Sequence, residues 1–330
     1  MQIKQAILQS EKQAVKDFLN TFDLNYKESE YTAYIEDENG VIGTVSVNGS
    51  LIMQLAVSKN YQGENLAVLL IDNAVKKLRE NGIFGYKVFT KPQYLPLFIN
   101  MGFKKLVETS NFVALEGGVA DINKEIAGLV KKVSMELGGV EDDSDCIVIN
   151  GNPFTLGHLQ LLEYALKKHK NLILFVLQEE GSFFTFKERF SLAFIATRPY
   201  YDKVSVLPST NYIVSKSTFP DYFLHNANEL TRAHAEYDAL IFKNYFMPAL
   251  KISKRYFGSE NSDYMSIYNQ TCKEVLKDGC EIVDRFTLNE QEISAKKVRA
   301  LIENGKVDEA LNFIPNSCKA LMKLILGSKR

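Results

Sequence analysis

The sequence predicts an α/β protein with an N-terminal α+β domain and a C-terminal domain built on a doubly wound parallel sheet. Three observations support this fold class. Between residues 31 and 57, three runs rich in β-branched and aromatic residues are separated by turn residues. Residues 121–137 repeat apolar side chains with a helical period. After residue 146, short apolar runs alternate with amphipathic runs, which is typical of parallel strands joined by helices.

The predicted boundaries are residues 1–117 for the first domain, 118–145 for a connecting helix and an acidic loop, and 146–330 for the second domain. Asp121 is the expected N-cap of the connecting helix, and Gly138-Gly139 ends it. The chain has 330 residues, of which 46% are hydrophobic, so it can fill two cores.

The first domain begins with an antiparallel meander whose first hairpin turn is Glu36 to Gly40. A helix from Leu66 to Arg79 follows, and Asn81-Gly82 closes it. A further strand then leads into a short helix that ends at Gly102-Phe103. The predicted strands of this domain are residues 31–35, 41–47, 51–57 and 85–89.

This order of parts resembles the GCN5-related acetyltransferase family, which cradles the pyrophosphate of coenzyme A in a loop after the fourth strand. The corresponding loop here is Gln62 to Ala67. Asn65 stands where the family has its middle glycine, and Phe98 stands where a tyrosine often protonates the leaving thiolate. A phenyl ring cannot donate a proton. The resemblance therefore favours a domain that binds a coenzyme-A-like arm or a partner, or that is structural, over one that transfers acetyl groups.

In the second domain, strands alternate with helices, and ligands of such sheets bind at the carboxyl ends of the strands. The predicted strands are residues 146–149, 171–177, 204–207, 239–242, 255–257 and 281–283, and the predicted helices are residues 159–169, 186–198 and 266–276.

The stretch from Asn150 to His158 joins the first of these strands to the first helix. At such a junction, backbone N–H groups and the positive end of the helix dipole converge, which favours an anion. His158 lies in the first helical turn, where its imidazole can reach the same anion, and Thr155 adds a hydroxyl. The residues predicted to hold the anion are Asn150, Gly151, Asn152, Phe154, Thr155, Gly157 and His158.

A second candidate begins at Ser294, the expected N-cap of a helix that runs to Asn304-Gly305. Lys296, Lys297 and Arg299 lie in its first turns, although the helix dipole disfavours cations there. An anion that offsets their charge explains this placement, and the alternative is a solvated basic turn.

The stretches Thr155-Leu156-Gly157-His158 and Ile293-Ser294 with Arg299 resemble the two phosphate-binding motifs of the Rossmann-like nucleotidyltransferase superfamily. An acetyltransferase-like domain fused to such a domain resembles the citrate lyase ligase family. Further stretches that carry this resemblance are Phe89 to Pro92, Asn152 to Phe154, Thr218 to Pro220 and Arg232 to Glu236.

The family resemblance implies that ATP and Mg²⁺ activate acetate as acetyl-AMP with release of pyrophosphate. The acetyl group then passes to the thiol of a coenzyme-A-like prosthetic group on the acyl carrier subunit of citrate lyase. The resemblance implies that His158, Thr155 and Arg299 are catalytic and that Ser294 and Lys296 also contact ATP.

Three alternatives stay open. The chain could be an adenylyltransferase of the phosphopantetheine or mononucleotide type, an acetyl-CoA-dependent N-acetyltransferase, or a non-catalytic binding module. The net charge of -1 gives no basic face for nucleic acid. No apolar run approaches the roughly 20 residues that cross a bilayer, and Met1 to Gln13 is too polar for a signal peptide. We therefore expect a cytoplasmic protein that binds neither nucleic acid nor membrane.

Dispersed cysteines and paired histidines give weaker indications. The four cysteines form no C-x-x-C pair, so neither a disulfide framework nor a protein metal site is predicted, and buried thiols are expected. His234 with Asp238, and His225 with Glu229, are spaced one helical turn apart and are expected to be exposed helix contacts.

Overall fold

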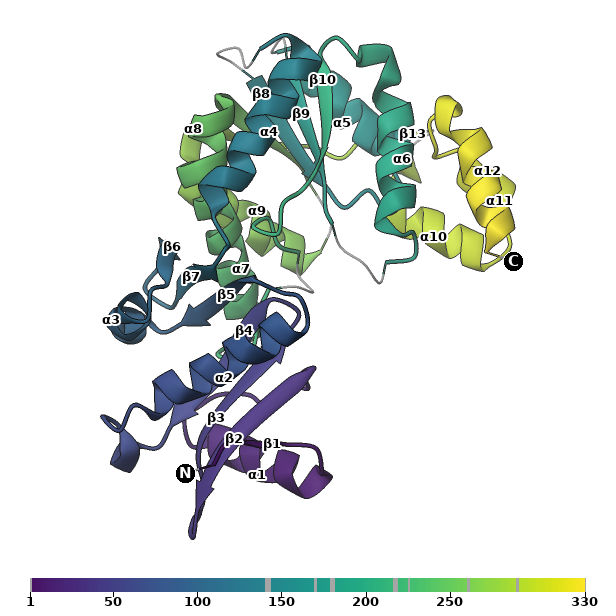
Figure 1. Cartoon of the computed structure of the whole chain (residues 1–330). Helices are drawn as coiled ribbons and strands as arrows, with labels where there is room; N and C mark the ends of the chain where they lie inside the picture. The colour runs from purple at the N-terminus through teal and green to yellow at the C-terminus, as the bar shows by residue number, and fades with distance from the viewer. Residues whose placement is uncertain are drawn as a thin grey trace. The chain divides into compact units, whose positions relative to one another are not determined.

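The computed structural model describes residues 2–139, 144–168, 171–178, 182–215, 219–224, 226–259, 262–288 and 291–329. The chain forms two compact units, one of residues 1–121 and 219–233 and the other of residues 122–218 and 234–330 (Figure 1). Residues 219–233, from the second half of the sequence, thus belong to the first unit. Among the described helices, none is both long and apolar enough to span a bilayer.

The first unit contains a seven-stranded sheet in the order β1-β2-β3-β4-β5-β7-β6, in which only the β4–β5 pair is parallel. The strands are β1 (Lys4–Gln5), β2 (Tyr31–Asp37), β3 (Gly40–Asn48), β4 (Leu51–Val57), β5 (Gly85–Thr90), β6 (Lys104–Glu108) and β7 (Val113–Gly118). The helices are α1 (Gln9–Asn20), α2 (Leu66–Glu80) and α3 (Leu95–Asn100).

Alternation along the strands explains how this sheet is covered on both faces. In β2, Ala33 and Ile35 pack with the core formed by α2, whereas Tyr34 packs with Val15 and Leu19 of α1. Successive strand residues point to opposite faces, so neighbours in the sequence enter different cores. The arrangement agrees with the expected acetyltransferase-like α+β fold.

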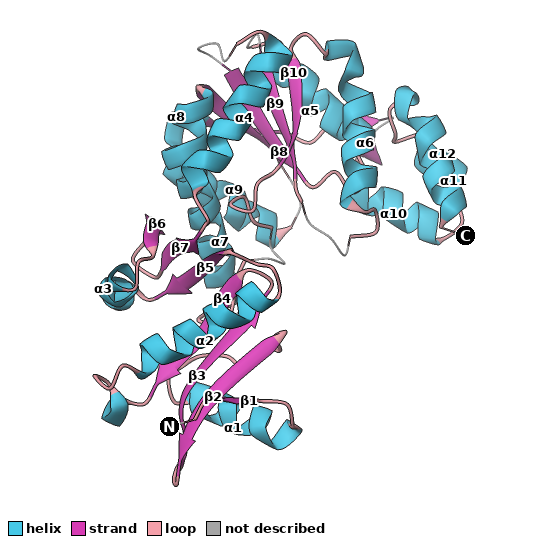
Figure 2. Ribbon diagram, in the orientation of Figure 1, coloured by secondary structure: helices cyan, strands magenta, loops and turns pink. Residues whose placement is uncertain are grey.

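The second unit contains a five-stranded parallel sheet in the order β10-β9-β8-β11-β12. Helices cover both faces of it (Figure 2). The strands are β8 (Ser144–Ile149), β9 (Asn171–Val176), β10 (Val204–Pro208), β11 (Ile252–Gly258) and β12 (Cys280–Val283), with a separate hairpin of β13 (Thr287–Leu288) and β14 (Gln291–Glu292).

The predicted doubly wound class is confirmed, because strand order reverses at β8. The helices are α4 (Ile122–Leu137), α5 (Leu156–Leu166), α6 (Phe186–Thr197), α7 (Ala227–Ile241), α8 (Met247–Leu250), α9 (Asp263–Leu276), α10 (Ala295–Glu303), α11 (Val307–Leu311) and α12 (Lys319–Ser328). Of the expected acidic loop at 141–145, residues 141–143 lie outside the described part of the chain, whereas Ser144 and Asp145 are buried and begin β8 instead of lying in a solvated loop.

One predicted strand is wrong. Residues 239–242 are helical, because α7 continues to Ile241 and a π-helical turn covers Phe242–Phe246. Ala239, Ile241 and Phe242 are all fully buried. A short apolar run of this kind is compatible with either a buried strand or a buried helix, and its periodicity does not distinguish them.

Candidate active site

The loop of residues 150–155, hereafter the motif loop, connects β8 to α5 at the carboxyl edge of the sheet. Gly151 has a φ of 63°, and a Cβ atom there would lie 3.1 Å from Cδ1 of Ile149. Both facts favour glycine. Thr155 is the N-cap of α5, so His158 is the third residue of that helix. The predicted position of His158 in the first turn is therefore correct.

The hydrogen bonds of His158 fix which imidazole nitrogen carries the proton. Its Nδ1 accepts from the backbone N–H of Thr155 at 2.9 Å and lies 2.9 Å from Thr155 Oγ1. Because an amide N–H occupies Nδ1, the neutral ring carries its proton on Nε2. Burial lowers the pKa of His158 to about 4, so the ring is neutral at pH 7. Nε2–H is thus a fixed, uncharged donor.

The second motif lies against the first. Ser294 is the N-cap of α10, and its Oγ accepts from the backbone N–H of Lys297 at 3.1 Å. A Cβ atom on Gly157 would lie 3.4 Å from Cγ2 of Ile293, so these two residues are in contact. Arg299 donates from its guanidinium to the backbone carbonyl of Asn152. The structure therefore brings the start of α10 to the start of α5.

The two lysines of the second motif are placed differently. Lys296 is exposed. The Lys297 ammonium lies 4.6 Å from the ring centroid of Phe313, as in a cation–π contact.

Two other predicted residues take part in packing. Phe154 is fully buried, and its ring centroid is 5.3 Å from that of His158. Asn152 accepts through Oδ1 from the backbone N–H of Phe184 at 3.1 Å. These contacts hold the motif loop and the imidazole in place. The backbone carbonyl of Asn150, by contrast, accepts a hydrogen bond from Arg189.

The N–H groups of Gly151 and Gly157 are among the backbone donors of this region that have no protein acceptor within the described residues. Gly151 is buried, and Gly157 is the second residue of α5, whose N–H lies beyond the helical ladder. The N–H of Leu156, in contrast, donates to the carbonyl of Phe313 at 2.9 Å. Buried N–H groups are nearly always paired in native proteins, so the N–H of Gly151 suits an anion. The N–H of Gly157 is at the helix start, where anions also bind.

Arg189 of α6 is a residue that the sequence analysis did not identify. Its side chain is fully buried, and it hydrogen-bonds to three backbone carbonyls around the motif loop. The signal was present in the sequence, because Arg189 lies in phase with the buried stripe of Leu192, Ala193 and Ala196. A charged residue at a core position of an amphipathic helix indicates a buried polar contact.

The expectation that His234 and Asp238 are exposed helix contacts is wrong. Their residues are 4% and 0% exposed. His234 bonds to Tyr264 Oη at 2.7 Å and to the Val214 carbonyl at 3.0 Å, whereas Asp238 pairs with Arg255 at 2.7 Å. His225, of the other expected pair, lies outside the described residues. All four cysteines are unpaired and buried, as predicted.

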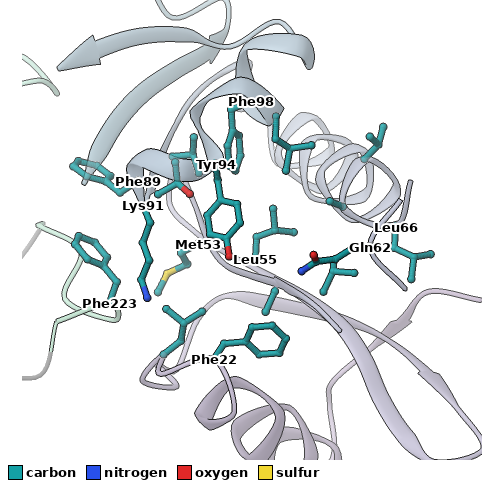
Figure 3. Close-up of a pocket in the computed structure, with 18 of the residues that line it drawn as sticks. Phe22, Met53, Leu55, Gln62, Leu66, Phe89, Lys91, Tyr94, Phe98 and Phe223 are labelled. Atoms are coloured by element: carbon teal, nitrogen blue, oxygen red, sulfur yellow. The ribbon is translucent and has the colours of Figure 1, made fainter. Parts of the chain in front are cut away.

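A cavity of about 360 Å³ lies in the first unit, separate from the motif loop (Figure 3). It forms where β4 and β5 diverge, because these strands pair only at Leu51 with Lys87 and Ile52 with Val88. Its walls are mainly apolar, and the polar side chains of Gln62, Lys91 and Tyr94 border it (Figure 3).

Both departures from the acetyltransferase pattern line this cavity. Asn65 adopts a φ of 59°, a left-handed conformation that asparagine tolerates, so the loop keeps a glycine-like backbone. Phe98 is 2% exposed, and its ring has no proton to give. Tyr222 and Phe223, which belong to the segment 219–233 of the first unit, also line the cavity. The cavity can therefore hold a ligand, and position 98 supplies no proton donor to it, as the sequence predicts.

The described residues contain no group of three or more histidine, cysteine, aspartate or glutamate side chains that could bind a metal ion.

Comparison with known proteins gives matches over both units. A family model described as the citrate lyase ligase C-terminal domain matches residues 144–322. The citrate (pro-3S)-lyase ligase of Escherichia coli (strain K12) is 28% identical over 311 residues, which cover 91% of this chain and 87% of that protein. The ligase of the same name from Klebsiella pneumoniae is 29% identical over 316 residues, with 92% and 90% covered. A solved acetyltransferase of the GNAT family from Staphylococcus aureus Mu50 aligns with 36% of this chain and 99% of its own at 13% identity, with a TM-score of 0.30.

Proposed function

We propose, since the chain belongs to the citrate lyase ligase family of acid–thiol ligases, that it activates acetate with ATP and acetylates a thiol on the acyl carrier subunit of citrate lyase. The observation that carries the ATP site is the contact between the two motifs, in which Arg299 binds the carbonyl of Asn152. Because the two motifs are in contact, the Arg299 guanidinium, the Nε2–H donor of His158 and the N–H groups of Gly151 and Gly157 all belong to one edge of the sheet.

In the first step, an acetate oxygen attacks the α-phosphorus of ATP, and the bond from that phosphorus to the bridging oxygen breaks. Acetate is ionised at pH 7, so no base is required. Pyrophosphate departs with the negative charge, and the chain's task is to stabilise that charge. We assign six groups to the phosphates: His158 Nε2–H, the N–H groups of Gly151 and Gly157, and the side chains of Ser294, Lys296 and Arg299. Thr155 holds the His158 ring through its N–H.

Mg²⁺ would neutralise part of the phosphate charge when it is bound with ATP. In the second step, the carrier's thiolate attacks the acetyl carbonyl carbon of acetyl-AMP. The bond from that carbon to the phosphate oxygen breaks, and AMP leaves with the electron pair. The products are the acetyl thioester and AMP.

For the first unit we propose a binding role without catalysis. Its apolar cavity, bordered by the amide of Gln62 and the ammonium of Lys91, suits the extended amide-bearing arm of a coenzyme-A-like group. Phe98 in place of a proton donor argues against acetyl transfer from acetyl-CoA in this cavity. Acetyl-CoA should therefore support no acetylation of the carrier when ATP is absent. Carrier acetylation by acetyl-CoA alone would contradict this assignment.

Exchange of labelled pyrophosphate into ATP tests the proposed function directly. We expect exchange that requires acetate and does not require the carrier, because acetyl-AMP forms before the thiol reacts. Exchange that requires a phosphorylated acceptor and ignores acetate would identify an adenylyltransferase. Absence of exchange with every acid tried, together with no binding of ATP, would identify a non-catalytic module.

A further inference from the structure

We propose that Arg189 is a positioning residue that aims the backbone N–H of Gly151 at the phosphates of ATP. This inference rests on the proposed function. Arg189 Nη1 donates to the carbonyl of Asn150 at 2.6 Å and to that of Leu177 at 2.9 Å, and Nε donates to the carbonyl of Phe184 at 3.2 Å. The three carbonyls belong to three segments: the residue after β8, the residue after β9, and the approach to α6.

The orientation of Gly151 follows from peptide geometry. Among the described residues, the one cis peptide bond joins Asn152 to Pro153, so the bond from Asn150 to Gly151 is trans. In a trans peptide, the C=O and the following N–H point in opposite directions. Because the carbonyl of Asn150 is held on the guanidinium, the N–H of Gly151 points away from it. No described residue accepts a hydrogen bond from that N–H.

The neighbouring strand shows the same geometry with its donor already paired. The carbonyl of Leu177 is also held by Arg189, and the next N–H, that of Gln178, donates to Ser209 Oγ at 2.9 Å. One guanidinium therefore sets two adjacent peptide units at the carboxyl edge of the sheet. After β9, the N–H of Gln178 is therefore bonded within the protein. After β8, we assign the N–H of Gly151 to the ligand.

Arginine suits this position because its planar fork donates in several fixed directions and keeps its charge when buried. A lysine ammonium is a compact charge on a flexible stem, so it cannot span the three carbonyls in the same way.

The chain offers a matched control in Arg255. This side chain is also buried, at 3% exposure, but it pairs with Asp238 at 2.7 Å and stacks between Phe242 and Phe257, each ring centroid 4.6 Å away. No contact joins it to residues 150–155 in the described structure. Arg255→Lys therefore reports the cost of shortening a buried arginine without disturbing the motif loop.

The experiment measures the affinities of ATP and adenosine by calorimetry in the wild-type protein, Arg189→Lys, Arg189→Met and Arg255→Lys. Loss of a hydrogen bond to a charged group costs about tenfold or more in affinity. In both Arg189 variants, we expect the affinity for ATP to fall about tenfold or more, whereas the affinity for adenosine should be almost unchanged. In Arg255→Lys, the ratio of the ATP affinity to the adenosine affinity should equal that of the wild-type protein. Amide hydrogen exchange of the wild-type protein should show ATP-dependent protection at Gly151.

The outcomes separate this inference from the proposed function. If the wild-type protein does not bind ATP, the proposed function fails. If the wild-type protein binds ATP but either Arg189 variant keeps the wild-type ratio of affinities, the positioning role is overturned and the ATP site stands. Should Arg189→Met not fold, Arg189→Lys and the exchange measurement still decide, because an unprotected Gly151 amide overturns the inference without any variant.

Discussion

Replacing His158 by alanine removes the uncharged Nε2–H donor, and it also removes the Nδ1 acceptor of the Thr155 N–H. The pKa of this ring is lowered to about 4, so at pH 7 only about one molecule in a thousand carries imidazolium. The loss is therefore that of one preorganised neutral donor and not of a buried charge. Removal of such a donor typically costs about 2.7–4 kcal/mol of transition-state stabilisation. We expect acetate-dependent pyrophosphate exchange to slow by roughly 10² to 10³.

The same assay across pH tests whether the ring is neutral. The ring is neutral well above pH 4, so its ionisation should not change the wild-type exchange rate between about pH 6 and 8. His234→Ala is the control, since it removes another buried imidazole of the second unit that does not contact the motif loop. Exchange per folded molecule should survive that change. Near-normal exchange in His158→Ala, or a change near pH 6.5 in the wild-type rate that the variant lacks, would refute the reasoning.

Two further changes give sharp expectations. Arg299→Ala should weaken ATP binding measured by calorimetry while thermal unfolding shows an intact fold; unchanged affinity would favour the solvated basic turn. Glu281→Gln should lower the free energy of unfolding in urea by about 1–2 kcal/mol after allowance for solvent screening. Desolvation alone would raise the pKa of Glu281, but hydrogen bonds from Lys168, Tyr164 and Lys254 outweigh it and lower that pKa to about 2. This stabilisation is thus present above the usual pKa of 4.5 and is lost as the pH falls toward 2. If the free energy of unfolding of Glu281→Gln fell with pH as steeply as that of the wild-type protein, the assignment would be disproved.

Local sequence patterns predicted the parts of the site that depend on neighbours in the chain. Thr155 and His158 interact within one helical turn, and Ser294 caps the helix that it begins. Both features follow from residue type and spacing. The bond from Arg299 to Asn152 joins residues 147 positions apart, and only the family resemblance suggested that the two motifs act together.

The features that the sequence analysis missed depend on distant partners. Asp238 looked like an exposed helix residue because its spacing from His234 is that of a surface pair, but Arg255 and Tyr268 enclose it in the fold. The helical stripe that Arg189 shares with Leu192 and Ala193 indicates that it is buried, but the carbonyls that it binds carry no side-chain signature in a sequence. The partners of such buried charges therefore cannot be read from a single sequence.

The return of residues 219–233 to the first unit has a consequence for biosynthesis. Tyr222 Oη donates to the carbonyl of Phe89 at 2.8 Å, and the Phe219 ring lies 5.5 Å from that of Phe89. A nascent chain that has reached residue 121 has all seven strands of the sheet but not these contacts. The first unit completes its packing only after three of the five strands of the second unit's parallel sheet have been translated, so its apolar cavity wall stays uncovered on the ribosome for that interval.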